Sequence, residues 1–434
     1  MMLPAVDAKF YDETRETMPR AQLHALQESL LLELLPHAFE HSPLIRQTWT
    51  EAGVHPRDVR SLDDFVERAP FIDKDALRRF RDERGDPFGG ICTLPPAELT
   101  AVMSTSGTTG DPTLVPEAWG RSTAPPAIIT RDLWGMGVRP GDHVALVLFT
   151  FRGPTYGLLQ GLGTVPILID FDPAEMPRFC DLSRRYRPTA LYNFGSALIN
   201  AVRDVCDDPR DVFSSYKAVV FAGEPLSPRT RATAREWGVE LYEHSSAGDV
   251  TGAFECHAHD GLHVWEDTAF VECLDPDGTE TVADGERGEL VATGLFNRTA
   301  PLVRYRSDDI VRLTRARCVC GRTHARIWPI GRKGDELIVD GRAVLPIDVW
   351  AAVESVDACA AGLFQIVRPA REVKTLQLRV GFAPAWESRS RTVRDAVRGA
   401  VTGAIGCEPE VELVPDAALL RLGPPHKIPR VVRP

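Results

Sequence analysis

The chain has few lysines, no long apolar run and an odd number of cysteines. Six lysines stand among its 50 basic residues, and 61 acidic residues give a net charge of −11 at pH 7. This acidic balance argues against nucleic acid or an anionic membrane surface as the main partner. No stretch of about 18 apolar residues occurs in the sequence, so we expect no membrane-spanning helix.

The nine cysteines are scattered and odd in number, unlike the paired cysteines of a disulfide-stapled secreted domain. The first 16 residues include four acidic side chains and lack the basic-then-apolar order of a secretion signal. We therefore expect a cytoplasmic protein. With 434 residues, 44% hydrophobic and 26% charged, the composition is typical of a soluble globular enzyme of about two or three domains.

The spacing of apolar residues predicts an α/β fold. Leucines three or four positions apart indicate helices over residues 18–51. Short apolar strands then alternate with helical stretches, which predicts a partly parallel core with strands at 144–149, 165–169, 190–193 and 218–221. A smaller piece follows residue 331, with strands expected at 337–339 and 376–381 and helices at 347–353 and 390–405. We predict a large multi-sheet N-terminal domain (residues 1–330) and a smaller α+β C-terminal domain (residues 331–434).

A segment rich in glycine and hydroxyl groups follows a predicted strand at 99–103. Its sequence is Ser104-Thr-Ser-Gly-Thr-Thr-Gly-Asp-Pro-Thr113. Gly107 and Gly110 permit close backbone approach, and the hydroxyls and backbone N–H groups together are suited to gripping a phosphate. It is not a Walker loop, because the Gly-Lys-Ser/Thr of that motif is missing. The alternative is an ordinary polar turn.

With this loop the chain resembles the adenylate-forming superfamily and, within it, the phenylacetate–CoA ligase family. Segments similar to that family follow in the expected order at 70–75, 156–163, 221–225, 254–267, 301–310, 331–346 and 427–430. The resemblance implies that a carboxylic acid reacts with Mg²⁺-bound ATP to give an acyl-adenylate, and that coenzyme A then takes the acyl group. It also implies that residues 1–330 bind ATP and the acid, that residues 331–434 form a mobile lid, and that the protein is a homodimer.

The resemblance assigns roles to individual residues. Lys427 is expected to stabilise the adenylation transition state, Asp249 to help place Mg²⁺, and Arg332 to lie near the ribose and α-phosphate. Contacts to the nucleotide are expected from Ser104, Thr105, Ser106, Gly107, Thr108, Thr109, Gly110, Ala222, Gly223, Glu224, Pro225, Ser246 and Asp309, the last of which grips the ribose hydroxyls. The acid, expected to be aryl or arylacetic, would contact Phe149, Arg152, Tyr156, Gly157, Phe194 and Gly195.

Three positions depart from the family pattern. Asp111 replaces the lysine of the phosphate loop, Asp249 replaces a glutamate, and Gly334 replaces an aspartate at the hinge between the domains. These departures leave two alternatives open. One is an adenylating enzyme that passes its acyl group to a carrier-protein phosphopantetheine or to an amine. The other is a nucleotide-binding homologue that has lost catalysis.

Two cysteine-bearing segments predict a structural zinc site. Cys318 and Cys320 form a close pair, and Cys256 and His263 flank a second loop. Four protein ligands of these types are typical of a closed tetrahedral Zn²⁺ site. His257 and His259 are substitute ligands. The alternative is a set of unrelated buried thiols and surface histidines.

Overall fold

The computed structural model describes residues 3–104, 113–118, 128–148, 155–170, 173–422 and 428–434. Its contacts divide the chain into two compact units. The first unit comprises residues 1–142, 149–166 and 244–329, and the second comprises residues 143–148, 167–243 and 330–434. No helix in the described ranges has both the length and the hydropathy to cross a membrane.

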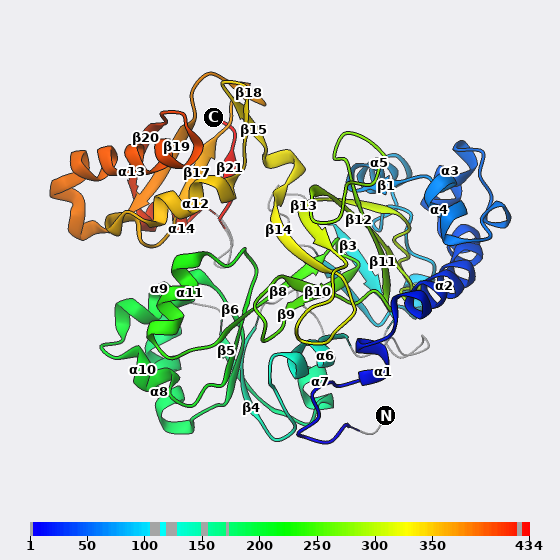
Figure 1. Ribbon diagram of the computed structural model, residues 1–434, viewed down its shortest axis with the longest axis horizontal. Helices are drawn as coiled ribbons and strands as arrows, with labels where there is room; N and C mark the ends of the chain where they lie inside the picture. The colour runs from blue at the N-terminus through cyan, green and yellow to red at the C-terminus, as the bar shows by residue number, and fades with distance from the viewer. Residues whose placement is uncertain (1–2, 105–112, 119–127, 149–154, 171–172, 423–427) are drawn as a thin grey trace. The chain divides into compact units, whose positions relative to one another are not determined.

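The first unit begins with helices and continues into a mainly antiparallel sheet (Figure 1). Its helices are α1 (Glu13–Glu16), α2 (Arg20–His41), α3 (Pro43–Glu51), α4 (Leu62–Arg68), α5 (Lys74–Arg84), α6 (Ile128–Gly135) and α7 (Thr155–Gly161). The helix starts follow local chemistry: Ser61 caps α4 by accepting the N–H of Asp64, and Asp73 caps α5 by accepting that of Ala76.

The strands of this sheet run in the order β11, β12, β13, β14, β10, β9, β8, and β1 pairs with β13. Their bounds are β1 (Ile72–Asp73), β8 (Leu241–Ala247), β9 (Thr251–Glu255), β10 (Leu262–Val264), β11 (Ala269–Leu274), β12 (Arg287–Gly294), β13 (Tyr305–Thr314) and β14 (Arg326–Arg332). Strands β2 (Ala101–Ser104) and β3 (Leu114–Glu117) form a separate hairpin. The hairpins β9–β10 and β13–β14 meet where β10 pairs with β14, so they bring distant stretches of sequence together.

The second unit contains a parallel α/β layer. β4 (His143–Leu148), β6 (Ala190–Phe194) and β7 (Ala218–Ala222) pair in parallel, with β5 (Val165–Asp170) beyond β4. Every residue of β6 and β7 is buried, as expected for parallel strands covered on both faces. The accompanying helices are α8 (Met176–Tyr186), α9 (Ser196–Val205), α10 (Pro209–Phe213) and α11 (Pro228–Glu236). The predicted α/β fold class is confirmed.

The C-terminal part of the second unit has its own core, which gathers residues from 337 to 411. A four-stranded sheet runs in the order β20, β19, β17, β21, and a smaller one in the order β16, β15, β18. The elements are β15 (Leu337–Val339), β16 (Arg342–Val344), α12 (Pro346–Glu354), β17 (Phe364–Val367), β18 (Glu372–Val373), β19 (Gln377–Phe382), α13 (Ser390–Ile405), β20 (Glu410–Pro415), α14 (Asp416–Leu420) and β21 (Val431–Val432). The strands and helices predicted here are confirmed, while the domain boundary near 331 stays a prediction.

Candidate functional site

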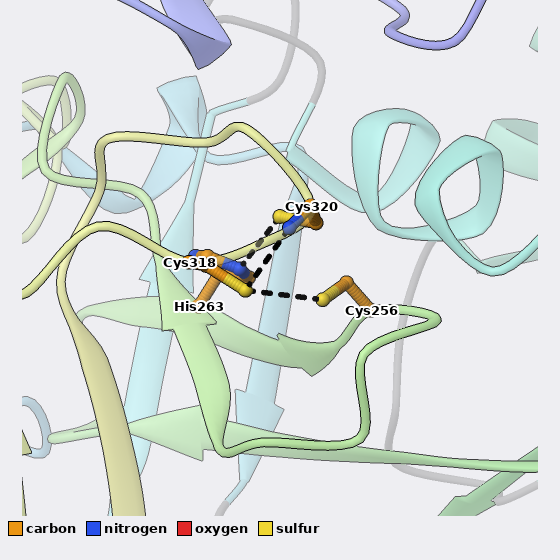
Figure 2. Close-up of side chains that lie close together, drawn as sticks. All are labelled: Cys256, His263, Cys318 and Cys320. Atoms are coloured by element: carbon orange, nitrogen blue, oxygen red, sulfur yellow. Dashed lines mark hydrogen bonds between the residues drawn. The ribbon is translucent and has the colours of Figure 1, made fainter.

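Three cysteines and one histidine gather in the first unit (Figure 2). Cys256 directly follows β9, His263 lies on β10, and Cys318 and Cys320 lie in the loop between β13 and β14. All four side chains are buried, and their ligand atoms lie within 4.8 Å of one another. The meeting of the two hairpins therefore brings together the four residues that the sequence predicts as zinc ligands.

The spacing of these atoms fits a tetrahedral ion. Bonds of about 2.3 Å to sulfur and about 2.0 Å to nitrogen place two sulfur ligands about 3.8 Å apart and a sulfur and a nitrogen about 3.5 Å apart. The Sγ atoms of Cys256 and Cys318 are 3.8 Å apart, and Cys320 Sγ is 3.3 Å from His263 Nε2. The donor set is also one that Zn²⁺ prefers, so these residues fit the metal.

Neighbouring groups favour the metal-binding forms of two members of the cluster, the neutral imidazole of His263 and the thiolate of Cys320. Burial lowers the pKa of His263, which keeps the imidazole neutral, and its Nδ1 lies 3.3 Å from the carbonyl oxygen of His324. That contact leaves Nε2 as the ligand atom. The hydrogen bond with Cys256 lowers the pKa of the Cys320 thiol, and the hydrogen bond with His263 lowers it further. The backbone N–H of Arg322 also donates to Cys320 Sγ at 3.5 Å, which favours a thiolate.

The two histidines proposed as substitute ligands do not join the cluster found among the described residues. His257 is exposed, and His259 lies 3.2 Å from Glu255 in an ion-pair contact. Of the two ligand sets that the sequence leaves open, the geometry therefore selects the one with His263.

A buried ionic network beside the cluster has no signal in the sequence. Arg322 donates to Cys320 Sγ at 3.7 Å and pairs with Glu16 of α1 at 2.8 Å. Glu16 is fully buried, and burial raises the pKa of its carboxyl group. Arg131 and Asp267 form a second pair at 3.1 Å, both buried. These pairs attach α1 to the loop between β13 and β14, and α6 to the segment that follows β10.

Asp249 and Asp309, two acidic residues with predicted roles at the nucleotide, lie on segments of the first unit that pack against each other. Asp249 is exposed and has a φ of 54°, and it follows Gly248, which has a φ of 60°. A Cβ at Gly248 would lie 3.5 Å from the Cβ of Ser307, so the turn packs closely on β13. Ser307 accepts the N–H of Asp309 at 3.2 Å, two positions along the same strand. Asp249, Asp309 and the exposed Ser246 therefore belong to one local region.

Other predicted residues follow the carboxyl ends of the parallel strands in the second unit. Glu224 accepts the N–H of Ser196 at 3.0 Å, which joins the segment after β7 to the segment after β6. Gly195 faces the same segment, since a Cβ there would lie 3.7 Å from the carbonyl oxygen of Ala222. Ligands of open α/β sheets bind at this edge. The residues placed here are Ala222, Gly223, Glu224, Pro225 and Gly195.

Phe194 lies instead in the core of the second unit. It is 2% exposed, and its ring is 5.9 Å from that of Phe179 and 5.8 Å from that of Phe213. These contacts are those of a packing residue, and its role toward the acid stays a prediction.

The remaining predicted residues lie apart from these groups or outside the described ranges. Tyr156 and Gly157 are exposed on α7, and Arg332 is half-buried at the end of β14. A Cβ at Gly334 would meet nothing within 4 Å, so the space there does not require a glycine. The described residues do not include Thr105, Ser106, Gly107, Thr108, Thr109, Gly110, Phe149, Arg152 and Lys427, and of Ser104 they give only the backbone at the end of β2.

The fold is that of the adenylate-forming ligases. A structure of 2-hydroxyisobutyryl-CoA ligase with 2-HIB-AMP in the post-adenylation state is 28% identical, covers 100% of this chain and 94% of its own, and has a TM-score of 0.86. The same enzyme with 2-HIB-AMP and CoA in the thioesterification state is 29% identical over the same shares, with a TM-score of 0.69. An anthranilate–CoA ligase shares the fold at 17% identity and a TM-score of 0.57, over 79% of this chain and 73% of its own.

Sequence relatives give the family, although no family model matches the chain. Phenylacetate–coenzyme A ligase of Thermus thermophilus is 31% identical over 383 residues, which cover 85% of this chain and 84% of the relative. The Escherichia coli enzyme of the same name is 31% identical over 343 residues, or 76% of each chain. This chain belongs to the phenylacetate–CoA ligase family. It is therefore an acid–thiol ligase of the AMP-forming kind, as its motifs predict.

Proposed function

We propose that this enzyme joins an aryl or arylacetic acid to coenzyme A by way of the acyl-adenylate. The observation that carries the proposal is the 31% identity with a phenylacetate–coenzyme A ligase over 85% of the chain. The turn at Gly248 packs against Ser307 of β13, close in sequence to Asp249 and Asp309, and Glu224 lies at the carboxyl ends of parallel strands. Both placements support a nucleotide site of the expected kind.

In the first step a carboxylate oxygen of the acid attacks the α-phosphorus of ATP. The bond to pyrophosphate breaks, and the acyl-adenylate forms. Lys427 offsets the negative charge of the two reacting anions, and Asp309 holds the ribose by accepting hydrogen bonds from its hydroxyl groups. The exposed carboxylate of Asp249 and the hydroxyl of Ser246 are suited to Mg²⁺, which would neutralise phosphate charge when bound. Arg332 and the segment 104–110 would contact the phosphates.

In the second step the thiol of coenzyme A loses its proton and attacks the acyl carbon. The bond to the AMP oxygen breaks, which gives the thioester and AMP. AMP is a far better leaving group than hydroxide, so the adenylate carries the activation needed for this step. The segment 331–335 is the proposed hinge that moves Lys427 away between the steps.

A second candidate acid is a small branched hydroxy acid. The observation that favours it is the TM-score of 0.86 with a 2-hydroxyisobutyryl-CoA ligase. Phe149 and Arg152, which are expected to contact the acid, lie outside the described residues, so an activity assay decides between a flat ring and a compact acid.

We propose that Cys256, His263, Cys318 and Cys320 hold a structural Zn²⁺ ion. With four protein ligands and no open position, the ion would cross-link two loops and would take no part in the reaction. We also propose a homodimer in the cytoplasm, which the elution volume of the purified protein and its cell fraction would test.

The deciding experiment measures ATP-dependent pyrophosphate release with benzoic, aminobenzoic, hydroxybenzoic, phenylacetic, 2-hydroxyisobutyric and short aliphatic acids, with and without coenzyme A. Release that depends on one aryl acid and turns over only with coenzyme A supports the proposal. A single burst that coenzyme A does not sustain indicates a carrier-protein or amine acceptor. No release with any acid would support a nucleotide-binding homologue without catalysis.

A further inference from the structure

Each thiol of the cysteine and histidine cluster accepts a backbone N–H from the residue two positions further along the chain. The donor and acceptor pairs, each 3.5 Å apart, are Ala258 to Cys256, Cys320 to Cys318 and Arg322 to Cys320. Hydrogen bonds from fixed backbone groups stabilise negative charge on an acceptor. These bonds therefore compensate part of the charge that thiolate ligands would carry.

The metal-bound cluster would still carry one net negative charge. Three thiolates outnumber the two positive charges of Zn²⁺, and a neutral imidazole adds none. All four ligand residues are buried. A buried charge is costly unless an opposite charge lies beside it. A cation close to the cluster would therefore favour the bound form.

Arg322 is a cation that the fold places there. Its Nη1 donates to Cys320 Sγ at 3.7 Å. The side chain is 2% exposed, and its guanidinium lies 5.1 Å from the ring centroids of both Phe10 and Phe254. A Cβ at Gly135 would overlap the ring of Phe254 and lie 3.1 Å from Arg322 Nη2. The glycine that ends α6 therefore leaves room for the guanidinium.

Glu16 is the second partner of this guanidinium. Arg322 Nε donates to Glu16 Oε2 at 2.9 Å, and Nη2 lies 2.8 Å from the same oxygen. Arg322 thus contacts two groups that would both be negative, the carboxylate of Glu16 and the thiolate of Cys320. Without the guanidinium, two buried negative charges would lie near one another with no cation to separate them.

The N-terminal segment is attached to the same loop. The other oxygen of Glu16, Oε1, accepts the N–H groups of residues 11 and 12, each at 2.9 Å. The carbonyl oxygen of Arg15 lies 2.8 Å from Nε2 of His324, and the carbonyl oxygen of His324 contacts His263. Residues 11–16 are therefore held by loop residues that also contact members of the cluster.

We infer that Arg322 balances the charge of the metal-bound cluster and thereby raises its affinity for the ion. The inference rests on the proposed structural Zn²⁺ and is independent of the proposed ligase reaction. Glu16 does not share this role, because its negative charge adds to that of the cluster. Metal binding and the anchoring of residues 11–16 are also coupled, since both use Arg322.

The test measures zinc affinity of the zinc-loaded protein by competition with a chelator of known affinity. Arg322→Gln is expected to lower the affinity by about tenfold to a hundredfold, as is typical when an outer partner of a metal ligand is lost. Arg322→Lys keeps the charge and is expected to bind zinc more tightly than Arg322→Gln. Glu16→Gln is expected not to lower the affinity. Two residues with purely structural roles would instead lower it together.

Arg317→Gln is the matched control. Arg317 lies in the same loop, next to Cys318, but it is exposed. Its replacement removes the same charge at a position screened by solvent, and the affinity should change by less than about twofold. A loss as large as that in Arg322→Gln would show that the overall charge of the loop controls binding, which would contradict a role for the buried contact.

Hydrogen exchange of residues 11–16 gives a second readout. Removal of zinc by a chelator is expected to speed exchange of this segment in the wild type by about tenfold. In Arg322→Gln the exchange is expected to be fast with and without zinc. An equal increase at β6, in the second unit, would show that the metal stabilises the whole chain and would exclude a specific coupling to the N-terminal segment.

The outcomes distinguish this inference from the metal site on which it rests. A wild type that binds no zinc would remove both. A wild type that binds zinc, with equal affinity in Arg322→Gln, would overturn the inference and keep the site. An equal fall in affinity in Arg322→Gln and Glu16→Gln would also overturn it. If Arg322→Gln does not fold, Glu16→Gln decides: weaker binding than in the wild type overturns the inference, and equal or tighter binding supports it.

Discussion

At the scale of single residues, neighbouring groups fix the backbone at Asp309, a residue predicted to bind the nucleotide. Its N–H donates to the hydroxyl of Ser307, which in turn donates to the backbone oxygen of Leu290 at 2.7 Å. This chain of hydrogen bonds fixes the backbone of β13 at Asp309. Asp309 is half-buried, which would strengthen the hydrogen bonds that we predict to the ribose hydroxyls relative to bonds made in open water.

Replacing Asp309 by Ala is expected to raise the KM for ATP by about tenfold to a hundredfold, because hydrogen bonds to a charged acceptor are lost. The melting temperature should stay near that of the wild type. Asp308→Asn is the control: Asp308 has a φ of 63°, which Asn tolerates, and its KM for ATP should be unchanged. Steady-state kinetics with varied ATP measure both. An unchanged KM in Asp309→Ala would remove Asp309 from the nucleotide site.

Lys427→Ala is expected to slow pyrophosphate release by about two to three orders of magnitude while ATP still binds, because electrostatic stabilisation of the transition state is lost. Lys374→Ala, which changes an exposed lysine, should have the wild-type rate. Rapid-quench measurement of pyrophosphate and equilibrium binding of ATP give the two quantities. Unchanged pyrophosphate release would disprove the role of Lys427.

At the scale of elements, the cysteine and histidine cluster connects pieces that the sheet alone holds weakly. Strand β10 has three residues, so its few ladder hydrogen bonds give limited support to the loops beside it. The cluster ties the loop after β9 to the loop between β13 and β14, and Arg322 extends the link to α1 through Glu16. A metal ion at this point would stabilise several elements together.

We expect the purified protein to carry about one zinc ion per chain, measured by elemental analysis. Cys256→Ser and Cys318→Ser should lose the metal and lower the Tm by about 5 °C or more, since metal binding contributes directly to folding free energy. Cys407→Ser, outside the cluster, should keep both the metal and the Tm. The proposal would be wrong if the wild-type protein contains no metal when folded and if a chelator present during folding has no effect. The four residues would then be ordinary buried groups.

At the scale of the whole molecule, stability depends on buried acids as well as on packing. Burial raises the pKa of Asp416, at the start of α14, to about 6, and Oδ1 of this side chain has no hydrogen-bond partner in the described structure. Because the pKa in the folded state exceeds that in the unfolded state, the folded state binds the proton more tightly. The stability contributed by the protonated group is complete below about pH 4 and is lost as the pH rises through about 6.

Asp416→Asn is therefore expected to gain about 1 to 2 kcal/mol over the wild type between pH 4 and pH 7, after allowance for partial exposure. Urea unfolding at several pH values measures the difference. Asp395→Asn, on the exposed side of α13, should follow the wild type across the same range. A constant difference between Asp416→Asn and the wild type over this range would contradict the raised pKa.

How much of this fold follows from sequence depends on how local each signal is. The sequence predicts the helix at 390–405 with its observed bounds. The structure shows the local reasons: Val393, Val397 and Val401 are buried on one face, and Gly406, with a φ of 74°, ends the helix. The strands β6 and β7 were predicted from continuous apolar runs. Phe194 ends one of those runs, and whether its ring faces the core or a ligand depends on Phe179 and Phe213, which lie on other elements.

The sequence by itself determined the class of chemistry and the residue types of the cysteine and histidine cluster, because motif order and residue chemistry are properties of the chain. Only the tertiary structure decided which residues meet. It selected His263 over His257 and His259, it placed Glu16 against Arg322, and it joined Glu224 to Arg430. Each of these pairings spans a long separation in sequence, and the partner is set by sheet pairing and burial, which no local pattern encodes.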